Sequence, residues 1–173
     1  MKYRKSMNIP AGFGSEEWFT VLNGPGRAGL AVIAASPSGI TGLLAEAGAM
    51  ADVIREAMRA PETPLMGALV QAYGHTSRDE YKALREAAGE DAQQPRDLAR
   101  VKEQALEGVR RALWTVTTKG TPEDVVAYKK LLLDVAQRVA GAAKEGGFLG
   151  IGGVQVSEAE KAAIAELRQL LGT

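Results

Sequence analysis

The chain has no cysteine, and this absence excludes several kinds of chemistry at once. A disulfide scaffold, a thiolate metal site and a cysteine nucleophile all need the missing residue. The chain also has one histidine only, so the usual zinc and copper ligand sets lack their second imidazole. We therefore expect no metal and no cofactor, and the lack of cysteine is compatible with a protein of the reducing cytoplasm.

The chain has no excess of charge of either sign. Twenty-one lysines and arginines balance twenty-one aspartates and glutamates, which gives a formal net charge of +0. Proteins that bind nucleic acids draw most of their affinity from phosphate contacts and normally carry a basic excess. Nucleic acid is therefore not an expected partner.

The sequence has little that resembles a membrane segment. Residues 28–45 contain no charged side chain, but Pro37 and several serines and glycines near their centre make a poor lipid-exposed helix. A buried core segment broken by a turn explains this stretch better than a membrane span. The basic residues 1–5 are followed by no apolar run, so a secretory signal does not fit.

Apolar residues recur at helical spacing through most of the chain, and no alternating run of strand length occurs. This pattern predicts an all-α fold: a compact multi-helix bundle of antiparallel helical hairpins, with a glycine-rich loop before the C-terminal helix. Residues 1–14 form an irregular N-terminal arm, and residues 15–173 form a single helical domain. The polar stretch 89–95 separates possible sub-halves at 15–90 and 95–173.

Several helix ends can be predicted from local signals. The sequence Asn23-Gly24-Pro25-Gly26 predicts the end of a short first helix, before a second apolar piece at 28–35. Gly120 followed by Thr121-Pro122 predicts one helix stop and the next helix start. Four residues are expected N-caps, namely Ser15, Ser77, Thr121 and Ser157.

Glu46 is the most unusual carboxylate of the sequence. The other charged residues of the predicted helix 40–59 gather on one arc, whereas Glu46 lies among glycine, alanine, leucine and methionine. A buried carboxylate needs a partner, for which Arg27 and His75 are the candidates. Glu46 is therefore either a structural ion-pair residue, the favoured interpretation, or a weak candidate for a catalytic acid or base.

His75 is the second weak catalytic candidate. It lies in Tyr73-Gly74-His75, near a predicted helix end, and an imidazole there can act as a general base. No nucleophile or partner stands at a recognisable spacing from it. A solvent-facing or backbone-bonded histidine at a helix end is the favoured interpretation.

The glycine-rich loop is the weak candidate for an anion site. Glycines ahead of a capped helix present backbone N–H groups to an anion, and a lysine stands nearby. The loop lacks the preceding strand and the Gly-Lys-Ser/Thr of a phosphate-binding loop, so structural docking of Phe148, Leu149 and Ile151 on the core is favoured. The residues of this candidate site are Lys144, Gly146, Gly147, Gly150, Gly152 and Gly153.

The sequence contains no catalytic constellation, and Trp18 and Trp114 are typical of core or interface positions. The function favoured by these observations is that of a non-enzymatic, soluble helical protein that associates with a protein partner or with its own copy. The alternative is a small enzyme or ligand-binding bundle with a pocket near Glu46, His75 or the loop 146–153.

Overall fold

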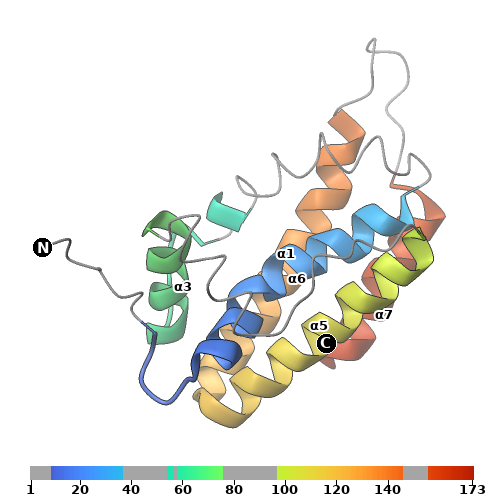
Figure 1. Cartoon of the computed structure of the whole chain (residues 1–173). Coiled ribbons are helices and arrows are strands. Elements are labelled where there is room, and N and C mark those ends of the chain that lie inside the picture. The colour runs from blue at the N-terminus through green and yellow to red at the C-terminus, as the bar shows by residue number, and fades with distance from the viewer. Residues whose placement is uncertain (1–8, 37–53, 57, 76–96, 146–155) are drawn as a thin grey trace, which may run out of the picture.

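The computed structural model of the chain describes residues 9–36, 54–56, 58–75, 97–145 and 156–173 (Figure 1). These residues form an all-α bundle and contain no strand, which confirms the predicted fold class. The described helices are α1 (Ser15–Ala35), α3 (Pro64–His75), α5 (Leu98–Lys119), α6 (Pro122–Glu145) and α7 (Glu158–Leu171), in addition to a helical turn at 54–56.

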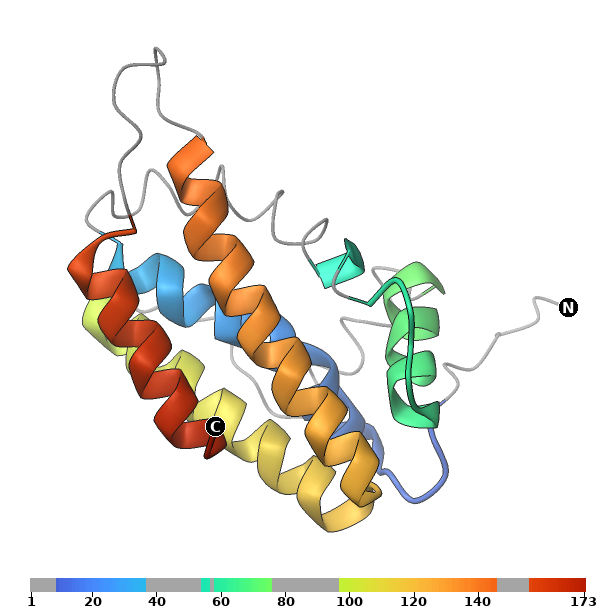
Figure 2. The ribbon, with the colours of Figure 1, turned by 180° about the vertical axis from the view of Figure 1, so that it is seen from behind.

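Helix α1 is the centre of the bundle and packs against α5, α6 and α7 (Figures 1 and 2). Its buried side chains point in every direction around the helix axis, from Trp18 and Phe19 at one end to Val32 and Ile33 at the other. A helix that is apolar all round is stable in water only when other elements enclose it. The remaining helices supply that enclosure, and each buries one face against α1 or its neighbours.

Helices α5 and α6 are joined by Gly120 and Thr121 and run in opposite directions from that connection (Figure 2). The predicted signals for this connection are confirmed. Gly120 caps α5, and Pro122 is the first residue of α6. The Thr121 hydroxyl accepts from the N–H of Asp124, while Asp124 Oδ2 accepts from the N–H of Thr121. These reciprocal bonds satisfy two backbone donors at the start of α6.

Asp124 lies near the start of α3 as well as at the start of α6. Burial of its side chain opposes ionisation, but the Thr63 hydroxyl and Thr121, together with the N–H of Leu65, outweigh that effect and lower the pKa of Asp124. Thr63 itself caps α3 by accepting from the N–H of Met66. The carboxylate therefore lies between two helix N-termini, where negative charge is favoured.

Helix α7 begins as predicted. The Ser157 hydroxyl accepts from the N–H of Glu160, and the Glu160 carboxylate accepts from the N–H of Ser157. Ala163, Leu167 and Leu171 then form the buried face of the helix, while Ile164 and Leu170 are half-buried beside them. Gly172 ends α7 in the left-handed conformation, with φ of +66°, which glycine adopts at little cost.

Two predictions about the first helix were wrong. The sequence Asn23-Gly24-Pro25-Gly26 does not end a helix, because α1 continues through it as one helix of 21 residues. Ser15 is not the N-cap either. Gly14 occupies that position, and its N–H donates to the Glu17 carboxylate at 2.8 Å, so the acid of the first turn satisfies the backbone donor of the cap residue.

The glycines of α1 and α5 allow unusually close packing. A Cβ atom on Gly24 would lie 1.9 Å from the Tyr128 hydroxyl and 3.1 Å from Ala112 Cβ. A Cβ atom on Gly108 would lie 2.0 Å from Nη1 of Arg27, so the arginine side chain crosses α5 at the glycine. Only a residue without a side chain fits at position 24. Glycine therefore serves close packing there and does not end the helix.

None of the described helices combines the length and the apolarity that crossing a membrane requires.

We expect Gly24→Ala to destabilise the protein by about 1–3 kcal/mol, because the added methyl group collides with a buried tyrosine that has no room to move. Gly67→Ala is the matched control: it lies in α3, where a Cβ meets nothing within 4 Å, and the better helix propensity of alanine should raise stability by up to about 1 kcal/mol. Urea unfolding of both variants checks this. Equal stability of the two variants would contradict the close approach at Gly24.

Candidate functional site

The most distinctive group of polar contacts surrounds Pro25 in the middle of α1. A proline has no N–H, so the carbonyl four residues earlier, that of Val21, loses its helical donor. In this protein the Tyr128 hydroxyl donates to Val21 O at 2.7 Å. Tyr128 comes from α6 and is fully buried, so a side chain from another helix replaces the missing backbone bond.

A second tyrosine acts on the next carbonyl of the same turn. The Tyr73 hydroxyl, from α3, donates to Leu22 O. Arg27 follows on α1 and lies against Gly108 of α5. Side chains from α3 and α6 thus converge on the proline turn of α1, and Arg27 extends from the same region onto α5.

The Tyr128 hydroxyl can act as a hydrogen-bond donor but is not suited to act as a base or nucleophile. Burial, reinforced by the nearby Tyr73, raises the pKa of Tyr128 well above the ordinary value of 10.0, although Arg27 acts in the opposite direction. The hydroxyl therefore stays protonated and remains a hydrogen-bond donor at physiological pH. Because it is fully buried and already bonded to Val21 O, it is placed to support the helix and has no access to a substrate.

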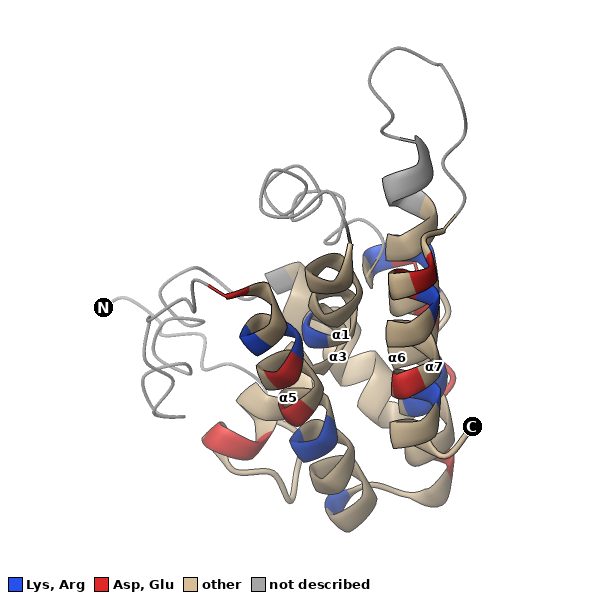
Figure 3. Cartoon of the chain, turned by 90° about the vertical axis from the view of Figure 1, so that its right-hand side faces the viewer, with Lys and Arg blue, Asp and Glu red and all other residues tan. Residues whose placement is uncertain are grey.

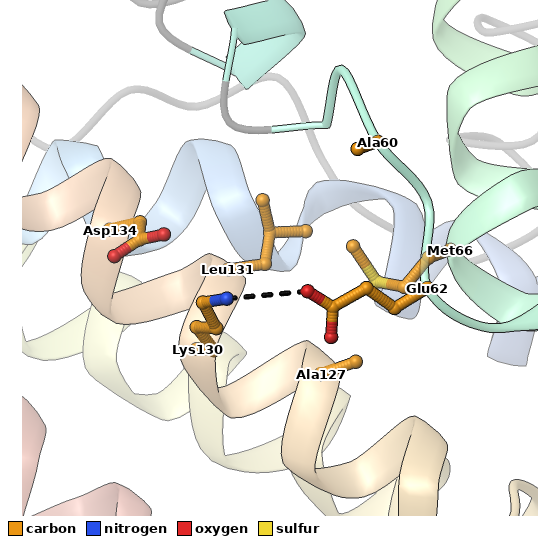
Figure 4. A pocket seen from close by; sticks show the side chains of 7 residues that line it. All are labelled: Ala60, Glu62, Met66, Ala127, Lys130, Leu131 and Asp134. Carbon is orange, nitrogen blue, oxygen red and sulfur yellow. Dashed lines mark hydrogen bonds and ion pairs between the residues drawn. The ribbon is translucent and has the colours of Figure 1, made fainter.

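A small open pocket lies between α6 and the segment that leads into α3 (Figure 4). Its polar feature is the ion pair between Lys130 Nζ and Glu62 Oε1, at 3.4 Å. The two side chains remain 64% and 67% exposed, and Figure 4 shows the ammonium turned toward Glu62. An ion pair this exposed is weak, and it offers neither a nucleophile nor an enclosed volume for a ligand. The pocket residues are Ala60, Glu62, Met66, Ala127, Lys130, Leu131 and Asp134.

Among the described residues, the outward face of α5 is the one place where a large aromatic side chain is open to solvent. Trp114 is 71% exposed, and Val126 in α6 is 68% exposed; no other large hydrophobic side chain among the described residues is exposed. Arg110 and Arg111 precede Trp114 by one helical turn, and threonines follow it by one turn. The core-facing side of α5 is formed by Ala105, Val109, Ala112 and Val116, so the fold does not use the tryptophan.

The predicted site residues lie largely outside the described part of the chain, so the predicted site stays a prediction. Glu46 and the glycines at 146, 147, 150, 152 and 153 lie outside the described residues. His75 is the last residue of α3 and Lys144 belongs to the last turn of α6, but their side chains are outside what the structure describes. Arg27, a proposed partner of Glu46, is half-buried on α1. The described residues contain no group of three metal-ligating side chains.

The sequence assigns no role to Tyr73 or Tyr128. It predicts a core or interface position for Trp114, and the exposure of Trp114 excludes the core. Tyr128 belongs to the apolar stripe of its helix. A tyrosine in such a position is expected to be buried, and its hydroxyl then needs an acceptor. The Val21 carbonyl freed by Pro25 was the available acceptor. No pattern in the sequence places these two on neighbouring helices, and a single tryptophan carries no signal of its exposure.

No protein-family model matches the chain, and no curated protein or solved structure matches it either.

We expect Tyr128→Phe to lower the free energy of unfolding by about 1–3 kcal/mol, because it leaves the Val21 carbonyl buried without a donor. Tyr73→Phe should cost less, about 0.5–1 kcal/mol, because Tyr73 is half-buried and water can replace its hydroxyl. Urea unfolding of the two variants measures both. A Tyr128→Phe variant as stable as the wild type would show that the carbonyl does not depend on Tyr128.

Proposed function

We propose that the protein is non-enzymatic and acts by binding another protein chain, its own copy included, through the outward face of α5 around Trp114. The observation that carries this proposal is the exposure of Trp114, at 71%, on a helix that already buries its opposite face. Tryptophan and arginine are the residues most enriched among those that dominate binding energy at protein interfaces. Here Trp114 has Arg110 and Arg111 one turn away.

The local structure supports this interpretation of the face. The threonines around Trp114 bond to their own helix: Thr117 donates to Leu113 O and Thr118 to Trp114 O, each at 2.8 Å. Their hydroxyl donors are thus already satisfied within the helix. A rigid aromatic side chain on a rigid helix loses little conformational entropy when a partner covers it.

An enzymatic role has less support in the described residues. The buried Tyr128 hydroxyl is already bonded, and the Lys130–Glu62 pocket is small and open. For location, the cysteine-free composition favours the cytoplasm, and we propose it on that ground.

Trp114→Ala should weaken association with the partner and leave the fold intact, since the exposed side chain has little contact with the core. Affinity should fall about 30-fold or more, as is usual for a dominant interface tryptophan. Val126→Ala is the matched control, because it removes an exposed apolar side chain from another helix. Co-purification from native cells, using each variant beside a differently tagged wild-type copy, measures the association.

Chains that are recovered with the wild type and with Val126→Ala, but lost with Trp114→Ala, would support the proposal. The same set of chains recovered with all three proteins would contradict it.

A further inference from the structure

From Glu103 to Trp114, the outward face of α5 carries its charges in two separate groups, and the exposed Arg100 precedes them by one turn. The acids Glu103 and Glu107 come first in this stretch, and the bases Arg110 and Arg111 follow one turn later, ahead of Trp114. Figure 3 shows the acidic segments of α5 between basic ones. The members of this face are exposed, apart from the partly exposed Glu107, and lie on the side of α5 opposite the core-facing Ala105, Val109, Ala112 and Val116. From Glu103 to Trp114, the order along this face is therefore acid, base, aromatic.

We infer that the partner of this face is a second copy of the chain, docked with the two α5 helices antiparallel. The inference rests on the proposed function, since it names the chain that covers Trp114. A twofold axis between Gly108 and Val109 places Glu107 of each copy opposite Arg110 of the other. The same axis places Glu103 opposite Trp114 of the other copy, where the indole N–H has a carboxylate to bond.

This arrangement follows from the charge order along the helix. In an antiparallel pair Glu107 of each copy meets Arg110 of the other, and Arg100 lies opposite the uncharged Thr117. The face is therefore complementary to itself, as a twofold interface requires. In a parallel pair acids would meet acids and arginines would meet arginines, which is unfavourable. The whole chain has a formal net charge of +0, so two copies approach without overall repulsion.

The ion pairs within α5 do not prevent this docking. Glu107 contacts Arg110 and, at 3.6 Å, Arg111 of its own helix, but the arginine side chains are 63% and 65% exposed. Exposed pairs of this kind are weak, so the arginines are free to share the carboxylate of the second copy. Helix α5 is about 33 Å long. One helix face buries less area than a standard stable interface, so we expect the dimer to dissociate with a Kd in the micromolar range.

The test is a charge exchange followed by sedimentation at increasing concentration. Glu107→Lys alone and Arg110→Glu alone should each weaken the dimer at least about tenfold, because each creates two like-charge contacts across the twofold axis. An equimolar mixture of the two variants should dimerise again, because both contacts then join opposite charges. Circular dichroism confirms that each variant folds, since both positions lie on the outward face of α5.

Glu158→Lys and Lys161→Glu are the matched controls. They exchange the charges of a pair with the same spacing on α7, where Lys161 Nζ and Glu158 Oε1 are 2.7 Å apart. Neither control should change the dimer, alone or mixed.

Three results would overturn the inference. A wild-type chain that stays monomeric at high micromolar concentration excludes the second copy as partner. A dimer that persists in both single variants excludes this register. A mixture that fails to dimerise excludes the antiparallel pairing of Glu107 with Arg110. None of these results bears on whether other chains bind through Trp114. The co-purification with Trp114→Ala tests the proposed function separately.

Discussion

The fold depends on how α1 can be both buried and interrupted by a proline. Pro25 lies in the middle of the most enclosed helix of the protein and removes the donor for the Val21 carbonyl. A backbone carbonyl without a partner in such a position costs as much as a lost hydrogen bond. The Tyr128 hydroxyl provides the missing bond, and Tyr73 provides one to the next carbonyl. The need of two α1 carbonyls for hydrogen-bond donors therefore favours the positions that α6 and α3 occupy beside the proline turn.

The same turn also sets the distance between helices. Gly24 leaves space for the Tyr128 ring against Ala112, and Gly108 leaves space for the Arg27 side chain over α5. Because so much of α5 is used in contact with α1, its opposite face has no role in the core. Trp114 lies on that unused face, and the proposed function rests on its exposure.

Local signals in the sequence were sufficient for the class of the fold and for several helix ends. The caps at Thr121 and Ser157 and the stop at Gly120 depend only on residues a few positions apart, and each was predicted. The continuity of α1 was not, because Gly-Pro-Gly is locally a helix terminator and the tyrosines that rescue it are 48 and 103 positions from Pro25. The face of Trp114 was equally out of reach, since exposure depends on which side of α5 meets α1. The candidates Glu46 and His75 remain predictions.

The role of the tyrosine at the proline turn is tested most directly by a double-mutant cycle on Pro25→Ala and Tyr128→Phe, read by urea unfolding. Alanine at position 25 restores a backbone N–H that can donate to Val21 O, so the loss of the tyrosine hydroxyl should then matter less. The account predicts that Tyr128→Phe costs at least about 1 kcal/mol less in the Pro25→Ala background than in the wild type. An equal cost in both backgrounds would contradict it, because the hydroxyl would then not be compensating for the proline.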